Sequence, residues 1–242
     1  MATSLVTGGS RGIGRAIALH LARDGHDVAI GYAASADAAE AVAREVRALG
    51  RRALTAGADL ADPAAPDALV DAVEAGLGPV EVLVANAGVN TPGRRVEEID
   101  LAEWDRLHAV NLRAPFLLAR RVLPGMAERG FGRIVLVSSV AAYTGGIIGA
   151  HYASSKAGLH GLAHSLAQQA AGSGVTVNVV APALIDSDML PADPDTRARL
   201  AGSIPVGRLG TVDEVADLVA AIVRNAYLTG QSILVDGGLH PT

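Results

Sequence analysis

The sequence predicts an α/β fold in which a parallel sheet of seven strands is covered by helices on both faces. Short apolar runs alternate with longer amphipathic segments along the whole chain, which is the pattern of successive βαβ units. The composition agrees, because 50% of the residues are apolar, mostly Ala, Val and Leu, and only 3% are aromatic. Such residues suit parallel strands that are buried on both faces. A length of 242 residues is enough for one such domain with one substantial core.

The expected elements alternate in chain order. The strands are the apolar runs at residues 4–7, 27–32, 52–56, 80–85, 133–138, 176–181 and 232–235. The helices cover residues 12–24, 37–49, 66–76, 101–129, 152–172 and 211–224. Right-handed crossovers between parallel strands place helices on both faces of the sheet. No linker rich in Pro, Gly or Ser divides the chain, so we expect residues 1–242 to form one doubly wound domain of the Rossmann type.

The first strand runs directly into a glycine-rich turn with the sequence Thr7-Gly8-Gly9-Ser10-Arg11-Gly12-Ile13-Gly14, and a helical pattern follows. Glycines at 8, 12 and 14 permit a tight turn and the approach of an anion to the helix N-terminus, whose free N–H groups and dipole favour negative charge. The spacing Gly-x-x-x-Gly-x-Gly is not the commoner Gly-x-Gly-x-x-Gly, and a loop that merely needs positive φ angles is the alternative. With a strand before it and a helix after it, the turn predicts a dinucleotide site.

The second strand bears on the choice of cofactor. It ends in Tyr32-Ala33-Ala34-Ser35, where an NAD enzyme usually presents an acid to the adenosine 2′-hydroxyl. No acid stands there, and the guanidinium of Arg11 can pair with a 2′-phosphate. The sequence therefore predicts NADPH/NADP+. A solvated loop charge is the alternative for Arg11, and the nearby Asp37 and Glu40 leave NADH/NAD+ open.

The strongest signal for chemistry follows the fifth strand. Ser138 and Ser139 lie at its end, where α/β enzymes place reactive groups. Tyr152 and Lys156 are four residues apart on the next expected helix, so both side chains face one way. An ammonium group beside a phenol lowers the phenol's pKa from about 10 and makes it a better acid at neutral pH. Taken alone, the pair is more often an amphipathic helix with a half-buried Tyr and a solvated Lys.

The sixth strand is followed by the least regular stretch of the chain, residues 182–205, which contains four prolines and four aspartates. Open α/β sheets bind ligands outside the carboxyl ends of their strands. We therefore expect a substrate lid at about residues 183–206. An ordinary surface loop is the alternative.

Composition excludes several other classes of function. Twenty basic and twenty-five acidic residues give a net charge of −5 without a long run of either sign, so nucleic acid is not expected as a partner. The absence of cysteine excludes thiolate catalysis and cysteine metal sites, the seven His lack metal-site spacing, and no metal is expected. Met1 leads directly into the first strand and no eighteen-residue apolar run follows, which predicts a cytoplasmic protein without membrane contact.

The order of these motifs resembles the short-chain dehydrogenase/reductase family over essentially the whole chain. The resemblance is carried by the glycine turn, Asn86-Ala87-Gly88, Asn111, Ser139, Tyr152 and Lys156. Within the family the chain is most similar to bacterial 3-oxoacyl-acyl-carrier-protein reductases. That similarity rests on the glycine turn, Val177-Asn178-Val179-Val180-Ala181-Pro182, Thr229-Gly230-Gln231 and Val235-Asp236-Gly237-Gly238.

The resemblance implies four catalytic residues. Tyr152 is the general acid, Ser139 hydrogen-bonds the substrate carbonyl, and Lys156 binds the nicotinamide ribose. Asn111 holds a water in a proton relay, although without the resemblance a locally bonded helical amide is the preferred interpretation. The thirteen-residue offset to Tyr152 matches the family for Ser139 rather than Ser138.

The resemblance also implies the cofactor site. Asn86-Ala87-Gly88, otherwise a plain turn, borders the two riboses, and Asp59-Leu60 after the third strand contacts the adenine. The full expected set is Gly8, Gly9, Ser10, Arg11, Gly12, Ile13, Gly14, Tyr32, Ala33, Asp59, Leu60, Asn86, Ala87, Gly88, Tyr152, Lys156, Pro182, Ile185 and Ser187.

The implied function is an NADPH-dependent ketoreductase that transfers hydride to a ketone, specifically a 3-oxoacyl thioester, as in fatty acid biosynthesis. The substrate is expected free or carried on acyl carrier protein, and the enzyme is expected to be a homotetramer. Within the family, the alternative substrate is a sugar, polyol, steroid or other small secondary alcohol or ketone. A non-catalytic regulator that binds NADP(H) is the alternative from another class.

Two departures from the family pattern affect the substrate side. Ala183 stands where family members commonly have glycine, and residues 89–95 take a course different from that of the acyl-carrier reductases. An acidic carrier protein needs basic side chains near the cleft, and the candidates are Arg94, Arg95, Arg113 and Arg129. A solvated surface is the alternative for each of them.

Overall fold

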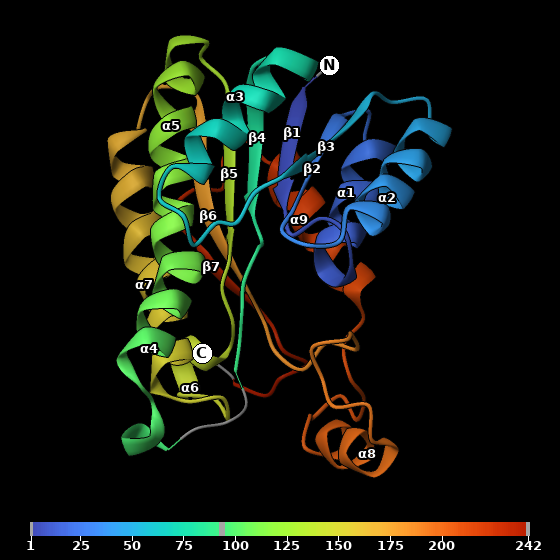
Figure 1. Cartoon of the computed structure of the whole chain (residues 1–242), viewed down its shortest axis with the longest axis vertical. Helices are drawn as coiled ribbons and strands as arrows, with labels where there is room; N and C mark the ends of the chain where they lie inside the picture. The colour runs from blue at the N-terminus through green and yellow to red at the C-terminus, as the bar shows by residue number, and fades with distance from the viewer. Residues whose placement is uncertain (1, 92–94, 241–242) are drawn as a thin grey trace.

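The computed structural model describes residues 2–91 and 95–240 (Figure 1). Within these ranges the strands form one sheet of seven in the order β3-β2-β1-β4-β5-β6-β7, and all neighbouring strands are parallel. The strands are β1 (Thr3–Thr7), β2 (Asp27–Tyr32), β3 (Ala53–Gly57), β4 (Val80–Ala85), β5 (Gly132–Val137), β6 (Val175–Pro182) and β7 (Ser232–Val235). The predicted parallel sheet is confirmed, with each strand displaced by no more than a residue from its expected range.

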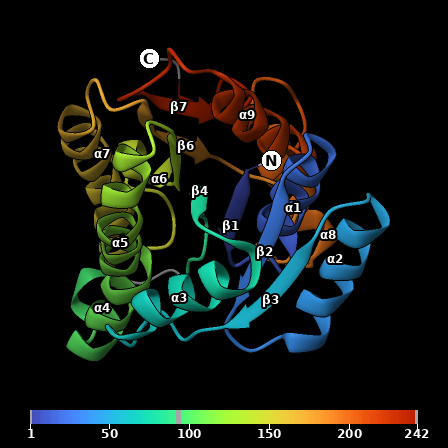
Figure 2. The ribbon, with the colours of Figure 1, turned by 90° about the horizontal axis from the view of Figure 1, so that it is seen from above.

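Helices cover both faces of this sheet, as Figure 2 shows. One face carries α3 (Ala65–Leu77), α5 (Ala114–Glu128) and α7 (Ala150–Gln169), and the other carries α1 (Gly12–Arg23), α2 (Ala36–Ala48) and α9 (Val212–Arg224). Buried side chains accordingly form two large clusters, one on each face. Neighbouring residues on a strand point to opposite faces, so Leu5 joins the cluster with α3, α5 and α7, and Val6 joins the other. The doubly wound architecture predicted from the sequence is confirmed.

The helix expected over residues 101–129 is interrupted. It consists of α4 (Leu101–His108), a π-helical turn η2 (Ala109–Arg113) and α5. Pro115 lies in the first turn of α5, directly after the π-turn, and lacks the N–H that would otherwise donate to a carbonyl of that turn. π-turns inside helices are frequent at functional sites, and this one contains the fully buried Asn111.

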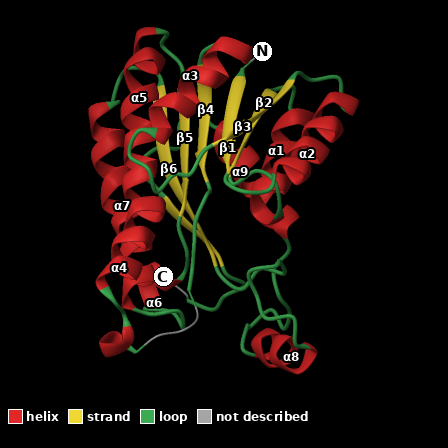
Figure 3. Cartoon of the chain, viewed as in Figure 1, coloured by secondary structure: helices red, strands yellow, loops and turns green. Residues whose placement is uncertain are grey.

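Three short elements were not predicted: η1 (Val96–Glu98), α6 (Ala141–Thr144) and α8 (Pro194–Gly202). α8 lies within the expected lid and buries none of its residues. Figures 1 and 3 show it apart from the two helical layers. Because hydrophobic periodicity reveals a helix only through a buried face, α8 could not be recognised in that way. Its N-terminus is capped by Asp193, whose carboxylate accepts a hydrogen bond of 2.8 Å from the Thr196 amide.

β1 and β4 are neighbours at the centre of the sheet. The chain continues from β1 to β2 toward one edge of the sheet and from β4 to β5 toward the other edge. Such a switch point opens a crevice at the carboxyl ends of the strands. The topology therefore selects this edge of the sheet for a ligand. As to membranes, the helices within the described ranges are all too short or too polar to span a bilayer.

Candidate active site

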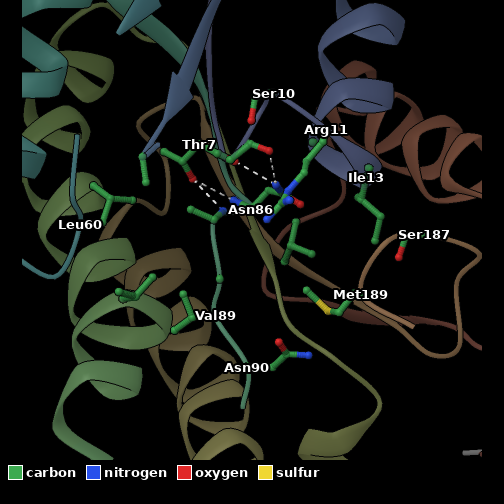
Figure 4. A pocket seen from close by; sticks show the side chains of 18 of the residues that line it. Thr7, Ser10, Arg11, Ile13, Leu60, Asn86, Val89, Asn90, Ser187 and Met189 are labelled. Atoms are coloured by element: carbon green, nitrogen blue, oxygen red, sulfur yellow. Dashed lines mark hydrogen bonds between the residues drawn. The ribbon is translucent and has the colours of Figure 1, made fainter. Parts of the chain in front are cut away.

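A cavity of about 560 Å³ lies at the carboxyl ends of the strands (Figure 4). Nearly all the residues expected at the site line it. They are Gly8, Ser10, Arg11, Gly12, Ile13, Gly14, Tyr32, Ala33, Asp59, Leu60, Asn86, Ala87, Gly88, Ser139, Tyr152, Lys156, Pro182, Ile185 and Ser187. Two expected residues, Gly9 and Asn111, do not line the cavity. The glycine turn and the Tyr152–Lys156 pair are far apart in sequence but line the same cavity.

The glycine turn forms the wall of the cavity that leads into α1. Gly8 and Gly12 adopt φ angles of +64° and +52°, which favour glycine. A Cβ on Gly14 would lie only 2.2 Å from the carbonyl oxygen of Gly8, so no side chain fits there. Gly9 instead faces the sheet, where its amide donates to the Gly31 carbonyl over 3.0 Å. α1 has neither a side-chain cap nor an acidic residue in its first turn, which leaves its N-terminal N–H groups available to an anion.

Thr7 and Asn86 join the ends of β1 and β4 beneath this turn. The Asn86 amide group donates to the carbonyl oxygen of Thr7 over 2.9 Å, and the Thr7 hydroxyl accepts from the backbone N–H groups of Asn86 and Ala87 at 3.1 and 3.0 Å. Figure 4 shows these two side chains meeting at the top of the cavity. Thr7 was not predicted to be a site residue. The only signal was a hydroxyl at the end of a buried strand, just before the glycines.

The end of β2 contains no carboxylate at the cavity. Tyr32, Ala33, Ala34 and Ser35 line it there. Of the two acids considered as NAD ligands, Glu40 is paired with Arg47 at 2.6 Å, which lowers its pKa, and Asp37 does not line the cavity. Arg11 is exposed, and no carboxylate of the described residues pairs with it. A basic side chain without an acidic competitor thus borders this part of the cavity.

Tyr152, Ser139 and Lys156 meet at the other end of the cavity. The Tyr152 side chain is buried, and the Ser139 side chain lies close enough to act on its pKa. The ammonium nitrogen of Lys156 lies 5.9 Å from the centre of the Tyr152 ring and donates to the Val137 carbonyl over 2.9 Å. Two hydroxyl groups and an amine therefore converge on a small region that faces the cavity.

The expected acidification of Tyr152 by Lys156 is not found. Burial raises the pKa of the phenol above its ordinary value, and the hydrogen bond from Ser139 opposes this only in part. Burial also lowers the pKa of Lys156 to about 8, so that the amine remains mostly charged at neutral pH. The ammonium is held by Val137, and desolvation of the phenol is the dominant effect. Tyr152 is therefore fully protonated at neutral pH.

The side chains of Ser138 and Ser139 point in different directions and have different partners. The Ser138 hydroxyl donates to the Lys156 carbonyl over 2.9 Å and lies 2.9 Å from Nε2 of His160, so it faces α7. The Ser139 hydroxyl accepts from the Ala141 amide over 3.1 Å, and Ser139 is the serine whose side chain acts on the pKa of Tyr152. The geometry agrees with the choice of Ser139.

Asn111, in η2, is fully buried and lies outside the lining of the cavity. Its amide accepts from the Val89 N–H over 2.9 Å and donates to the Val89 carbonyl over 3.0 Å. It is thus bonded to a distant segment rather than locally. A Cβ built on Gly88 would lie 3.3 Å from both the Asn111 Oδ1 and the Lys156 Nζ atoms, so glycine allows these two side chains to approach the backbone closely.

The cavity also has lining residues that were not predicted, among them Val89, Asn90, Arg106, Val110, Asp188, Met189 and Leu190. Figure 4 shows Val89 and Asn90 across the cavity from Met189. No sequence motif marks these positions: Arg106 and Val110 belong to α4 and η2, and the others lie in irregular segments. Arg106 is 3.8 Å from the Asp59 carboxylate.

The four arginines considered for carrier-protein docking fare differently. Arg94 lies outside the described residues. Arg95 pairs with Glu97, and Arg113 donates to the Ala61 carbonyl over 2.5 Å. Arg129 donates to the carbonyl of Val80, the first residue of β4, and so lies at the sheet edge opposite the cavity. The assignment of Arg129 to the cleft was wrong, because helix α5 runs back to the amino ends of the strands before Arg129 is reached.

Comparison with known proteins agrees with this geometry. Residues 2–198 match the short chain dehydrogenase family. The 3-oxoacyl-[acyl-carrier-protein] reductase FabG of Escherichia coli (strain K12) is 39% identical over 240 residues, which cover 98% of this chain and 96% of that protein.

Solved structures are equally similar. A blue fluorescent protein from a metagenomic library, crystallised in complex with NADPH, superposes with a TM-score of 0.93 at 39% identity, covering 99% of this chain and 98% of its own. A short-chain dehydrogenase/reductase from Serratia marcescens BCRC 10948 gives a TM-score of 0.92 at 39% identity, with 98% and 97% covered. With its sheet order, its glycine turn and these similarities, the chain belongs to the short-chain dehydrogenase/reductase family of oxidoreductases, which act on CH-OH and C=O groups.

Proposed function

We propose that the protein is an NADPH-dependent ketoreductase that reduces the ketone of a 3-oxoacyl thioester. The observation that carries this proposal is that Ser139, Tyr152 and Lys156 line the same cavity as the glycine turn, with the Ser139 side chain close enough to Tyr152 to act on its pKa. The reductase relatives at 39% identity support the reaction and the substrate class.

The residues of the cavity fit NADPH. The uncapped N-terminus of α1 and the crowding that excludes a side chain at Gly14 make a cradle for a pyrophosphate. Asn86 and Gly88 lie beside it for the riboses, and Asp59 and Leu60 for the adenine. Arg11 supplies the charge for a 2′-phosphate, and the similar blue fluorescent protein was crystallised with NADPH. When bound, NADPH supplies the hydride.

Tyr152 and Ser139 act on the ketone oxygen in this proposal. Negative charge develops on that oxygen during reduction, and two hydroxyl donors held in advance stabilise it. Tyr152 then gives its proton to the oxygen. Its raised pKa favours this direction, because the phenol carries the proton at neutral pH.

Lys156 and Asn111 return a proton to Tyr152 in this proposal. Lys156 uses one N–H for the Val137 carbonyl, and its charged form has two more for a ribose hydroxyl and a water. Gly88 lies beside both Asn111 Oδ1 and Lys156 Nζ, which supports a relay that passes between these two side chains. Because the pKa of Lys156 is about 8, the ammonium is present below that pH and is lost above it.

The substrate end of the cavity supports an acyl chain. Val89, Val110, Met189 and Leu190 line it with apolar surface. We propose that residues 183–206, including α8, close over the substrate, since Ile185, Ser187 and Met189 line the cavity while α8 buries no residue. Homotetramer formation is also proposed, because α4, η2 and α5 expose Trp104 and Phe116 beside an apolar groove.

The proposal is tested by following NADPH oxidation with acetoacetyl thioesters, carried either on coenzyme A or on acyl carrier protein. Turnover is expected with NADPH in preference to NADH. Tyr152→Phe removes only the acid and should lower kcat by about 10²–10⁴-fold while the Kd for NADPH stays within about twofold. Tyr227→Phe is the matched control, because Tyr227 is 98% exposed and should be neutral.

Each other outcome identifies an alternative. Turnover of sugars, polyols or steroids without thioester reduction would move the enzyme to another substrate class of the same family. Tight NADPH binding without turnover across a broad ketone panel would indicate a regulator. Full activity of Tyr152→Phe would contradict the proposed acid.

A further inference from the structure

His160 does not line the cavity that contains Ser139, Tyr152 and Lys156. It is on α7, one helical turn beyond Lys156 and two beyond Tyr152. Its half-buried ring contacts side chains from the end of β5, from α6 and from β7. No step of the proposed reaction uses it.

The ring is hydrogen-bonded at both nitrogens. Nε2 lies 2.9 Å from the Ser138 hydroxyl, and Nδ1 lies 2.9 Å from the Ser232 hydroxyl of β7. The Tyr143 hydroxyl approaches Nδ1 at 3.3 Å, with its ring edge-on to the imidazole at 5.0 Å. The His160 side chain therefore connects α7 to the end of β5, to α6 and to β7.

The partners determine where the protons lie. A carbonyl oxygen can only accept, so the 2.9 Å bond between Ser138 and Lys156 uses the hydroxyl hydrogen of Ser138. Ser138 must then accept from His160, which requires a hydrogen on Nε2. Nδ1 of the neutral ring accepts from Ser232. Burial and the neighbouring His164 lower the pKa of His160, which agrees with a neutral ring.

This arrangement holds the segment that carries Ser139. The backbone N–H groups of Ser138 and Val140 donate to the carbonyls of Val180 and Pro182 on β6, at 2.7 and 2.9 Å. The Val137 carbonyl accepts from Lys156. Ser139 is therefore flanked by residues bound to β6 and α7, and the side-chain connection to α7 depends on Ser138 and His160.

We propose that His160 is a positioning residue, whose Nε2–H donates to Ser138 and thereby keeps Ser139 and Lys156 in register. The inference rests on the proposed function, because it assigns those two residues to catalysis. Its effect is expected mainly on kcat, through Ser139, since within the described ranges the hydrogen bonds of His160 and Ser138 go to α6, α7, β6 and β7 and not to the glycine turn or Asn86. A hydroxyl shifted by a fraction of an ångström stabilises the developing charge less well.

The test compares two substitutions at one position. His160→Leu removes the donor and should lower kcat about tenfold while leaving the Kd for NADPH within about twofold. His160→Gln places an amide N–H where Nε2 stood and should keep kcat within about twofold of the wild type. Gln168→Leu, two turns further along α7 at an exposed position, is the matched control and should change neither quantity.

Unchanged kcat in His160→Leu would overturn the proposal, and so would an equal loss in the Leu and Gln variants. Adding Ser138→Ala to His160→Leu should cost little more than either change alone, because both break one connection. Additive losses would also overturn it.

An inactive wild-type protein is a different result, which contradicts the proposed function itself. Histidine-selective ¹⁵N NMR supplies a readout independent of turnover, and an Nδ1–H tautomer for His160 would refute the assignment.

Discussion

The two walls of the cavity are built differently. The cofactor wall, from the glycine turn to Asn86, is held by backbone crowding and by bonds between two central strands. The lid wall, residues 183–206, is joined to the rest of the fold by backbone bonds near its two ends, to Val235, Gly210 and Gly237. Between these ends it carries a helix with no buried residue, which Arg197 connects to Asp186 and Pro191 of the lid itself.

The difference shows which recognition task each wall can perform. Close backbone packing fixes the position of a ligand common to the whole family, and it allows little substitution. Exposed ion pairs contribute little stability, typically about 0.2–1 kcal/mol, and can rearrange when a substrate enters. We therefore expect changes in the cofactor wall to cost more than changes in the lid.

The largest effect is expected for Gly14→Ala. The new Cβ would lie 2.2 Å from the Gly8 carbonyl oxygen and 2.6 Å from the Asn86 amide nitrogen, neither of which can move freely. Overpacking of this kind costs about 1–3 kcal/mol of unfolding free energy, and displacement of the turn should weaken NADPH binding by about 10²-fold. Thermal unfolding and calorimetric titration measure the two quantities. Gly161→Ala, where nothing lies within 4 Å, should leave cofactor binding unchanged. Wild-type NADPH affinity in Gly14→Ala would refute the role of crowding.

An intermediate effect is expected for Arg11→Ser. Charge-assisted hydrogen bonds contribute about 1.5–3 kcal/mol, so the ratio of kcat/KM for NADPH over NADH should fall by about ten- to a hundredfold. Arg15→Ser is the control, since Arg15 is one turn away but occupied by Glu45 at 2.7 Å, and it should affect both cofactors alike. Equal efficiency of the two cofactors in the wild type would contradict the predicted NADPH preference.

The smallest effect is expected for Arg197→Ala in the lid. Loss of an exposed ion pair should raise KM for the thioester about two- to fivefold, with kcat and NADPH affinity nearly unchanged. Arg199→Ala on the same helix, at an exposed position, is the control. A loss larger than that of Gly14→Ala would reverse the comparison between the walls.

Local patterns were sufficient for much of the fold and the site. Each strand is an apolar run of its own, and the glycine turn and the pair of Tyr152 and Lys156 are each contained in one short segment. Their spacing along a known element places side chains on one face without knowledge of the rest. The break in the expected helix at η2 and the isolated α8 were missed, because a π-turn and a helix without a buried face leave no periodic signal.

What the sequence by itself determined is the order of the elements and the chemical groups delivered to the carboxyl edge of the sheet. Only the tertiary structure decided how those groups are joined: Thr7 to Asn86, Asn111 to Val89, and His160 to Ser138 and Ser232. It also decided that the pKa of Tyr152 rises rather than falls. The physical reason is that hydrogen bonding and desolvation depend on neighbours far away in the chain, which are brought into contact only when the sheet and its helices pack.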